Sequence, residues 1–499
     1  MRSNIGANYA GQLYTTLLTV LMVPVYIRFL GAEAYGLVGF FALLQAWFQL
    51  LDVGLSPTMG RETSRFSAGV IDILSLRQLL RTLEGLFVGL GLAGMIAVVW
   101  GADAITSRWL NLEQLPEVEV RQSLMLMGAV AAMRWVCGLY RGAISGFERL
   151  VWLNGFNAAI ATARFVLVLP VLHFVGAKPV VFFGYQALVA AVELVGLVLT
   201  SYRLLPRVPS GEAVTWRWGA LSRVLKFSLG ITFTSTVWVV TTQLDKLVLS
   251  KLLPLSDYGV FTLAVLAAGG VLVVSNPVNG ALVPRLTSLN AAGDDTGLLR
   301  VYCNATQMVA VISFSAAAML ACFAWQVLWV WSGDAEIARK AAPILGLYAI
   351  GNGVLAVAAF PYYLQVAKGD LKLHLWGNAI FASALVPSVI WSATNYGAFG
   401  AGITWVLVNM LNLLLWVPCV HRRFFPKLHV RWLLDILPIA ILAIGMAALL
   451  SRLVTWEPGR IGAGIELALL AGLVVAAALA GSSWARNELY SMIRIGTKR

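Results

Sequence analysis

The stretch that decides the fold reads Arg28-Phe-Leu-Gly-Ala-Glu-Ala-Tyr35-Gly36, and it lies between two apolar runs. A second stretch, Lys251-Leu-Leu-Pro-Leu-Ser-Asp-Tyr258-Gly259, lies between two further apolar runs, 223 residues after the first. With a one-residue slip, Arg61 after the first pair of runs corresponds to Arg285 after the second. A duplicated membrane half is typical of transporters, because two related bundles can rock about a shared central site.

The composition is typical of a membrane-embedded chain. Hydrophobic residues make up 60% of the sequence, charged residues make up 12%, and the mean hydropathy is +0.82. These values exclude a soluble fold. Because about 20 apolar residues cross the bilayer core, we expect an all-α polytopic membrane protein with about fourteen transmembrane helices. The apolar runs lie near residues 5–30, 35–56, 82–101, 122–142, 152–172, 180–202, 227–250, 257–280, 301–325, 341–364, 373–393, 398–419, 434–454 and 461–481.

The distribution of Lys and Arg predicts the orientation. The segments on the same side as the N-terminus hold 24 of the 36 basic residues, and the opposite loops hold 10. The positive-inside rule therefore places both termini in the cytoplasm. This bias also explains most of the net charge of +13, so no nucleic acid partner is expected.

Short loops and missing motifs argue against catalysis. No P-loop, no His-Glu-x-x-His and no Gly-x-Ser-x-Gly occurs, and an ATP-driven pump or a hydrolase would need one of them. The four cysteines and four histidines lack the spacing of a metal site. We therefore expect no enzyme activity, no catalytic residue, no cofactor and no metal.

Several predicted helices carry polar residues at helical spacing. Stripes of this length on several helices favour a water-filled cavity, whereas the alternative is hydrogen bonding between packed helices. The candidate cavity residues outside the arginines are Asn8, Gln12, Gln45, Gln49, Asn157, Thr232, Ser235 and Lys246.

Two arginines indicate what such a cavity would hold. Arg134 and Arg164 lie well inside their spans, where an arginine costs roughly 3 kcal/mol to insert. Arg141 follows Arg134 by seven residues on the same helical face. Guanidinium groups match phosphate and carboxylate oxygens, so this cavity would prefer an anion. The alternative is that Glu193 neutralises one arginine in a fixed ion pair.

Three carboxylates are candidates for a coupled proton or sodium ion, namely Asp52, Glu193 and Asp245. For Asp52, a structural role at a helix end is an equally good interpretation. The sequence does not decide between the two ions.

The opening region resembles a known family. Asn8-Tyr-Ala-Gly11, Phe29-Leu-Gly-Ala-Glu-Ala-Tyr-Gly36, Leu51-Asp-Val-Gly-Leu55 and Arg61-Glu-Thr-Ser-Arg65 are similar to the polysaccharide-exporter branch of the multidrug/oligosaccharidyl-lipid/polysaccharide (MOP) superfamily. Its Wzx-type flippases handle O-antigen, capsule and exopolysaccharide repeat units. The resemblance covers about the first 70 residues and the Pro284-Arg285 echo, and elsewhere it depends on the helix count.

The resemblance implies two pseudo-symmetric six-helix lobes around a central cationic cavity, and the last two predicted helices lie outside the twelve-helix core that is common in that family. We place the lobes at residues 1–205 and 227–425, a cytoplasmic linker at 206–226, and the extra helices with a basic tail at 426–499. The implied substrate is an undecaprenyl-pyrophosphate-linked oligosaccharide, moved from the cytoplasmic to the outer leaflet of the bacterial inner membrane. The implied partners are membrane lipids, a proton or sodium counter-ion, and the polymerase and chain-length proteins of the same pathway.

Three rival functions stay open. A lipid II flippase has a similar fourteen-helix layout and an anionic lipid substrate. A drug exporter of the same superfamily would share the lobes, but cationic drugs need acidic cavity residues. A membrane glycan polymerase or ligase would need a large outer loop, and the loops here are short.

Overall fold

The computed structural model describes residues 2–52, 54–207, 214–216, 218–454, 456 and 459–488. Its side chains are described over the same ranges except 2–10, 218, 220–235, 276–277 and 279–281. Over these residues the chain is helical and contains no β-strand beyond one isolated bridge. The predicted all-α class is therefore confirmed.

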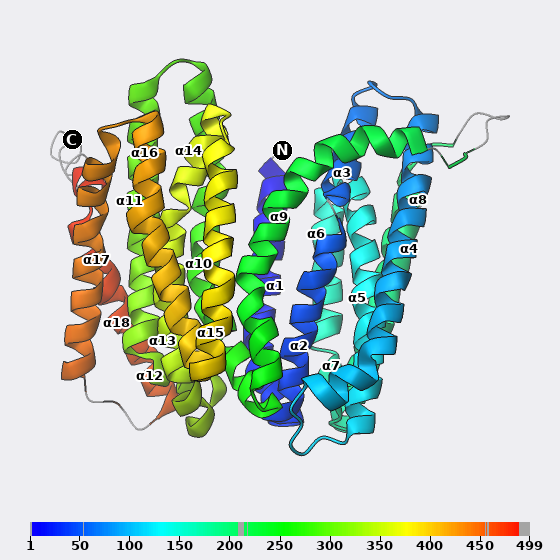
Figure 1. The fold of residues 1–499 in the computed structure, drawn as a ribbon, viewed down its shortest axis with the longest axis horizontal. Helices are drawn as coiled ribbons and strands as arrows, with labels where there is room; N and C mark the ends of the chain where they lie inside the picture. The colour runs from blue at the N-terminus through cyan, green and yellow to red at the C-terminus, as the bar shows by residue number, and fades with distance from the viewer. Residues whose placement is uncertain are drawn as a thin grey trace. The chain divides into compact units, whose positions relative to one another are not determined.

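The chain forms two compact units, unit 1 from Met1 to Gly259 and unit 2 from Val260 to Arg499 (Figure 1). The helices of unit 1 are α1 (Arg2–Leu30), α2 (Ala32–Phe48), η1 (Gln49–Asp52), α3 (Leu55–Ser67), α4 (Ile73–Ala104), η2 (Ile105–Trp109), α5 (Glu117–Gly146), α6 (Leu150–Phe165), α7 (Val168–Phe174), α8 (Pro179–Leu204) and α9 (Trp218–Leu252). Helix α10 (Leu255–Ala291) begins in unit 1 and continues in unit 2. The helices that follow are α11 (Asp295–Cys322), α12 (Ala324–Ser332), α13 (Ala335–Ala358), α14 (Phe360–Lys368), α15 (Lys372–Leu411), η3 (Asn412–Trp416), α16 (Val417–Phe424), α17 (Leu428–Leu453) and α18 (Arg460–Gly481).

Twelve segments of the described chain are long and apolar enough to cross a membrane. One of them, Lys372–Phe424, has 53 residues, which is far more than the roughly 20 that one crossing needs. Gly397 interrupts it with a positive φ of 58°, between the predicted runs 373–393 and 398–419. The chain is thus a multi-pass membrane protein, and the number of fourteen crossings stays a prediction.

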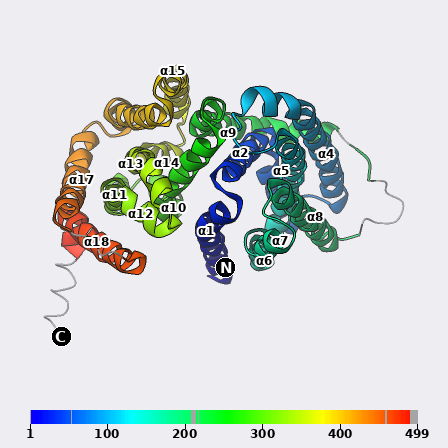
Figure 2. The ribbon, with the colours of Figure 1, turned by 90° about the horizontal axis from the view of Figure 1, so that it is seen from below.

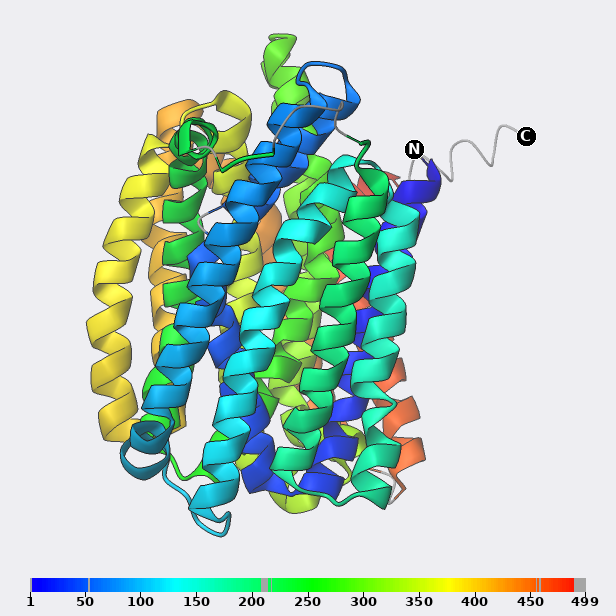
Figure 3. The same cartoon turned by 90° about the vertical axis from the view of Figure 1, so that its right-hand side faces the viewer.

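Helix α5 forms the centre of unit 1. It packs against α3, α4 and α8, and it lies beside α4 and α8 when the bundle is viewed along its axes (Figure 2) and from the side (Figure 3). Gly138, Gly142 and Gly146 follow one another at four-residue intervals on α5, and a Cβ on any of them would meet α3. Small residues at this spacing let two helix backbones approach closely.

The two copies of the repeated turn lie against each other within unit 1. A Cβ on Gly36 would meet Leu255, and a Cβ on Gly259 would meet Ala32. Gly36 corresponds to Gly259 and Ala32 to Leu255, both at the repeat distance of 223 residues. Such reciprocal contacts are typical of a two-fold relation. The glycine of the motif is therefore explained by this close approach, which leaves no room for a side chain.

One loop fastens both copies of the turn. Glu33 accepts hydrogen bonds from the backbone N–H groups of Glu113, Gln114 and Leu115, at 2.7, 2.9 and 3.2 Å. The backbone oxygen of Asn111 accepts from the N–H of Leu255 at 2.9 Å. The loop between η2 and α5 thus binds the first turn through the Glu33 carboxylate. It binds the second turn through the backbone of Asn111 and through its side chain, whose Nδ2 donates to the carbonyl oxygens of Lys251 and Leu253 at 2.9 and 3.3 Å.

Unit 2 is built around α11, which packs against α13, α17 and α18. Its apolar core includes residues of the two last helices, and Trp432 of α17 is fully buried. A buried polar contact joins α11 to α16, because the hydroxyl of Tyr302 lies 2.8 Å from Nε2 of His421. The two C-terminal helices therefore belong to the core of unit 2.

Candidate functional site: an arginine cluster in unit 1

Two polar ladders face each other between α5 and α8. Arg134 and Arg141 are seven residues apart on α5, and Gln186 and Glu193 are seven apart on α8. Arg134 Nη2 donates to Gln186 Oε1 at 2.9 Å, and Arg141 Nη2 donates to Glu193 Oε1. Both pairs span 52 residues, so the two helices run parallel and in register, with two helical turns between the rungs.

Arg134 is the buried member of the cluster. Its side chain is 8% exposed, and its Nε lies 4.0 Å from Glu193 Oε2. The guanidinium also lies over the ring of Phe41 on α2, with its carbon 5.7 Å from the ring centre. Nε and Nη1 have no hydrogen-bond partner among the described residues. Arg134 is therefore held by the Gln186 amide, the Phe41 ring and the charge of Glu193, while two of its three guanidinium nitrogens make no hydrogen bond to the described residues.

Arg164, near the end of α6, joins the cluster through its backbone. Gln186 Nε2 donates to the carbonyl oxygen of Arg164 at 3.0 Å, so one glutamine connects the two predicted arginines. The guanidinium carbon of Arg164 lies 4.9 Å from the centre of the Phe165 ring. No carboxylate of the described residues lies within 4.0 Å of it.

The ion pair considered as the alternative is present. Glu193 is 2% exposed and pairs with Arg141, whose side chain is 38% exposed. One carboxylate therefore faces Arg134 and Arg141, and Arg164 adds a third positive charge. Such charges are expensive in a membrane interior. The cluster keeps an excess of positive charge even though Glu193 compensates part of it.

The predicted polar stripes do not all reach this cluster. Gln12 and Gln49 are exposed, whereas Gln45 and Asn157 are partly buried. Within the described side chains, no hydrogen bond joins any of the four to an arginine of the cluster. The side chains of Asn8, Thr232 and Ser235 lie outside the described residues. A cavity lined by these stripes stays a prediction.

Of the candidate ion-coupling residues, Asp52 has the clearest local role. Its Oδ1 accepts from the N–H of Ser56 at 3.0 Å and from the Ser56 hydroxyl at 2.8 Å. It therefore caps the start of α3, as the helix-end interpretation expected. This contact leaves an additional role in ion coupling untested.

Asp245 and Lys246 neighbour each other on α9. Lys246 Nζ lies 3.5 Å from Asp245 Oδ1 and 2.5 Å from the carbonyl oxygen of Thr242. The predicted cationic site residue Lys246 thus lies beside the predicted ion-coupling residue Asp245. Their opposite charges therefore partly compensate each other.

Sequence reasoning missed Gln186. The seven-residue spacing from Gln186 to Glu193 matches the spacing from Arg134 to Arg141, and this match was the available signal. Sequence reasoning also missed Glu84, a buried carboxylate on α4 that accepts from the hydroxyls of Tyr140 and Tyr202 at 3.0 and 2.8 Å.

Comparisons with known proteins agree with this architecture. The family model described as polysaccharide biosynthesis protein matches residues 1–290. Among solved structures, the lipid II flippase MurJ in an inward closed conformation is similar with a TM-score of 0.70 and 13% identity, covering 94% of this chain and 97% of that one. A multidrug resistance MATE family transporter of the MOP superfamily in an inward-facing conformation gives 0.66 and 14%, covering 81% and 94%.

A MOP superfamily transporter from Pyrococcus furiosus, described by the reverse polarity of its binding pocket, gives a TM-score of 0.57 and 15% identity, covering 83% of this chain and 92% of that one. At these identities the likeness establishes the shared fold. No curated protein matches the sequence.

Proposed function

The chain belongs to the polysaccharide biosynthesis protein family, and from that premise we propose that it is a flippase for undecaprenyl-pyrophosphate-linked oligosaccharides. It moves O-antigen, capsule or exopolysaccharide repeat units from the cytoplasmic to the outer leaflet of the bacterial inner membrane. Alternating access of two lobes, 1–205 and 227–425, exposes the site to each side in turn. The segment 206–226 links the lobes, and 426–499 extends the second.

The observation that carries the proposal is the excess of positive charge in the arginine cluster. Arg134 keeps two N–H groups without a partner among the described residues, although its side chain is buried. A pyrophosphate supplies the negative charge and the acceptor oxygens that such donors bind best. The family supports a saccharide-linked substrate, and the fold shared with MOP transporters supports movement across the membrane.

The same cluster disfavours a cationic drug as the substrate, because it holds three arginines and one glutamate. It does not by itself separate a glycan repeat unit from lipid II, since both are carried on a polyprenyl pyrophosphate. The likeness to MurJ keeps lipid II as the second candidate. A polymerase or ligase of the same pathway is the third candidate, and no feature of the described residues favours it.

Deleting the gene tests the proposal directly. We expect one lipid-linked oligosaccharide to accumulate in the inner leaflet and the surface glycan to disappear, with both effects reversed by the wild-type gene. The lipids are extracted and identified by mass spectrometry. Accumulation of lipid II with arrested cell-wall synthesis would assign the second candidate instead. Accumulation of unpolymerised units in the outer leaflet would point to the polymerase.

The proposed orientation has its own test, motivated by the basic bias of one set of loops. Reporter fusions after Phe66, Arg207 and Arg431 should report the cytoplasm, and fusions near Gln114 and Asp334 should report the periplasm. Fusion activity is measured with a pair of reporters that work on opposite sides. A reversed pattern at two or more sites contradicts the proposed topology.

A further inference from the structure

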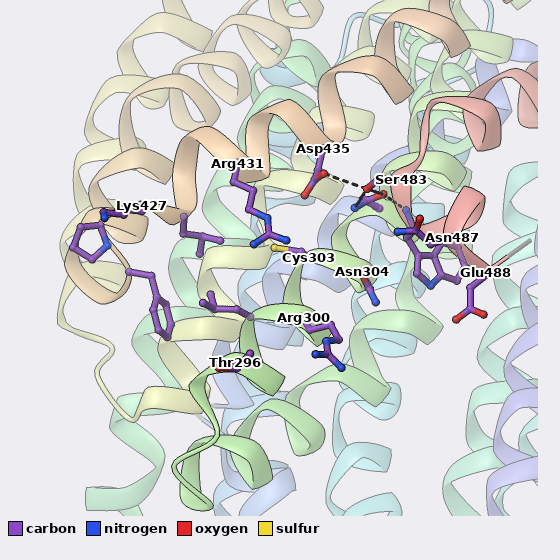
Figure 4. Close-up of a pocket in the computed structure, with 16 residues that line it drawn as sticks. Thr296, Arg300, Cys303, Asn304, Lys427, Arg431, Asp435, Ser483, Asn487 and Glu488 are labelled. Atoms are coloured by element: carbon purple, nitrogen blue, oxygen red, sulfur yellow. Dashed lines mark hydrogen bonds between the residues drawn. The ribbon is translucent and has the colours of Figure 1, made fainter. Parts of the chain in front are cut away.

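A pocket of about 1080 Å³ opens in unit 2, whereas the arginine cluster belongs to unit 1. It lies where α11 and α17 begin and where the chain leaves α18, so its walls come from three separate segments (Figure 4). Its volume is at the upper end of the range that small ligands occupy in proteins. In the proposed topology this end of unit 2 faces the cytoplasm.

Gln307 of α11 holds one wall of the pocket in place. Its Oε1 accepts from the hydroxyl of Ser482 at 2.8 Å and from the N–H of Trp484 at 2.9 Å. Its Nε2 donates to the hydroxyl of Ser483 at 3.0 Å. Gln307 is buried, so the segment after α18 is tied to α11 by a glutamine that is satisfied on both sides. The pocket is therefore formed by fixed elements.

Positive side chains surround the pocket from two helices and the turn before one of them. Arg300 comes from α11, Arg431 from α17, and Lys427 from the turn before α17 (Figure 4). None of the three has a carboxylate within 4.0 Å among the described residues. Two carboxylates, Asp435 and Glu488, also line the pocket (Figure 4), and Asp435 accepts a hydrogen bond from the Ser483 hydroxyl at 3.2 Å. The three basic residues therefore leave an excess of one positive charge in the lining.

The remaining lining suits the part of a lipid next to its headgroup. Leu299, Leu428, Phe425 and Trp484 present apolar surface, while Asn304 offers an amide one helical turn after Arg300 on α11 (Figure 4). A free inorganic anion would make no favourable contact with the apolar surface. A glycerophospholipid uses both kinds of wall, because its phosphodiester is followed by a glycerol backbone and acyl chains.

We propose that this pocket binds the phosphodiester headgroup of an anionic phospholipid from the adjoining leaflet, with Arg300 and Arg431 as the main contacts. Basic pockets between transmembrane helices on the cytoplasmic side are suited to anionic headgroups. Arginine adds a planar set of donors that matches phosphate oxygens. Since the site joins α11, α17 and the segment after α18, the bound lipid fastens the two C-terminal helices to the core of unit 2. The transported substrate plays no part in this binding.

The test measures thermal unfolding of the full chain in detergent with added short-chain lipids. A ligand that binds only the folded protein raises the melting temperature. We expect phosphatidylglycerol to raise it more than phosphatidylcholine of the same chain length. The double change Arg300→Gln and Arg431→Gln should abolish this preference, whereas Arg300→Lys with Arg431→Lys should keep part of it. The control Arg422→Gln with Lys372→Gln removes the same charge from exposed positions outside the pocket, and it should behave like wild type.

A second variant blocks the pocket without changing its charge. Asn304→Trp should also remove the preference for phosphatidylglycerol. This variant tests the proposal even if the double arginine variant folds poorly. Inorganic phosphate and glycerol phosphate are added separately. Equal stabilisation by these soluble anions would assign the site to a free phosphate compound and overturn the lipid assignment. Equal effects of the two lipids on wild type, or an unchanged preference in Asn304→Trp, would also overturn the proposal.

Discussion

The most buried candidate spans of the two units carry different polar residues at their centres. In unit 1, α5 carries Arg134, which is charged and keeps two N–H groups without a partner among the described residues. In unit 2, α13 carries Asn352, which is neutral and 5% exposed. Asn352 Nδ2 donates to the carbonyl oxygen of Ala268 at 3.0 Å, and its Oδ1 accepts from Trp405 Nε1 at 3.0 Å.

The same contrast holds for buried carboxylates. Glu62, Glu84, Glu193 and Asp245 are buried in unit 1, whereas no Asp or Glu is buried among the described residues of unit 2. The predicted duplication accounts for the long apolar helices of both units but not for this difference in charge. Of the four buried carboxylates of unit 1, Asp245 lies in the second predicted lobe (227–425) and the other three lie in the first. If the arginine cluster is the proposed anion site, unit 1 is the half that is specialised for the charged part of the substrate.

The largest effect should come from Arg134→Ala. If Arg134 binds the substrate anion, the loss of a charge-assisted interaction worth about 1.5–3 kcal/mol should lower export about 10- to 150-fold. Folded protein should remain, because the change also removes a buried charge that costs roughly 3 kcal/mol to insert. Surface glycan and folded protein in detergent are measured together.

Arg134→Lys is the matched control, since it keeps the charge but loses the planar set of donors. It should recover export in part. An Ala variant that is stable and fully active would remove Arg134 from the site and erase the proposed specialisation of unit 1. The same pair of changes at Arg164 tests the second positive charge.

Glu193→Gln should have the next largest effect, on stability. It leaves Arg134 buried without its compensating charge, and breaking a buried pair in this way costs about 3 kcal/mol. Replacing Arg134 by Met in the same protein should restore most of the loss, because the buried charge is then gone as well. Thermal unfolding of the two variants decides the matter. A Glu193→Gln protein as stable as wild type would show that Glu193 does not compensate the cluster.

Asn352→Leu probes the other side of the comparison. It leaves Trp405 Nε1 and the carbonyl of Ala268 without their partner, and each unsatisfied buried group costs about 1–3 kcal/mol. We expect a lower melting temperature with export per folded molecule close to that of wild type. A loss of export comparable to that of Arg134→Ala would mean that both units contribute polar contacts to transport, and the contrast between them would fail.

The smallest effect should follow Asp52→Ala. It removes the cap of α3, which costs about 1 kcal/mol, while Asp52→Ser should keep most of the cap because its hydroxyl can still accept from Ser56. Both variants should export normally if Asp52 acts only at the helix end. Export that fails in the Ser variant despite normal stability would instead support ion coupling.

The overall class was predictable because the membrane imposes it. Apolar length alone identifies helices that must cross a bilayer, and basic residues bias the loops between them. The positions of Arg134 and Arg164 were also predictable, because a charged residue inside an apolar run can be recognised before its partner is known. Gln186 was not, because a single glutamine has no meaning until the register of α5 and α8 sets Arg134 opposite it.

Breaks in the helices were harder to predict than the helices themselves. The second apolar run was expected to extend to residue 56, yet α2 ends at Phe48. Gly54 has a positive φ of 70°, which glycine adopts without strain, and α3 starts immediately after it. The Leu51-Asp-Val-Gly-Leu55 motif contains both the break and the cap of the next helix. Sequence similarity identified the motif, but only the backbone conformation showed its purpose.

The loop that Glu33 holds should behave unlike a loop in amide exchange. Its residues Glu113 and Gln114 are exposed, and surface loops ordinarily exchange at a free energy close to zero. Here three successive N–H groups end on one carboxylate in the first turn of α2. These amides become accessible to solvent only when their hydrogen bonds to Glu33 break. We therefore expect the loop and the start of α2 to exchange as one cooperative unit.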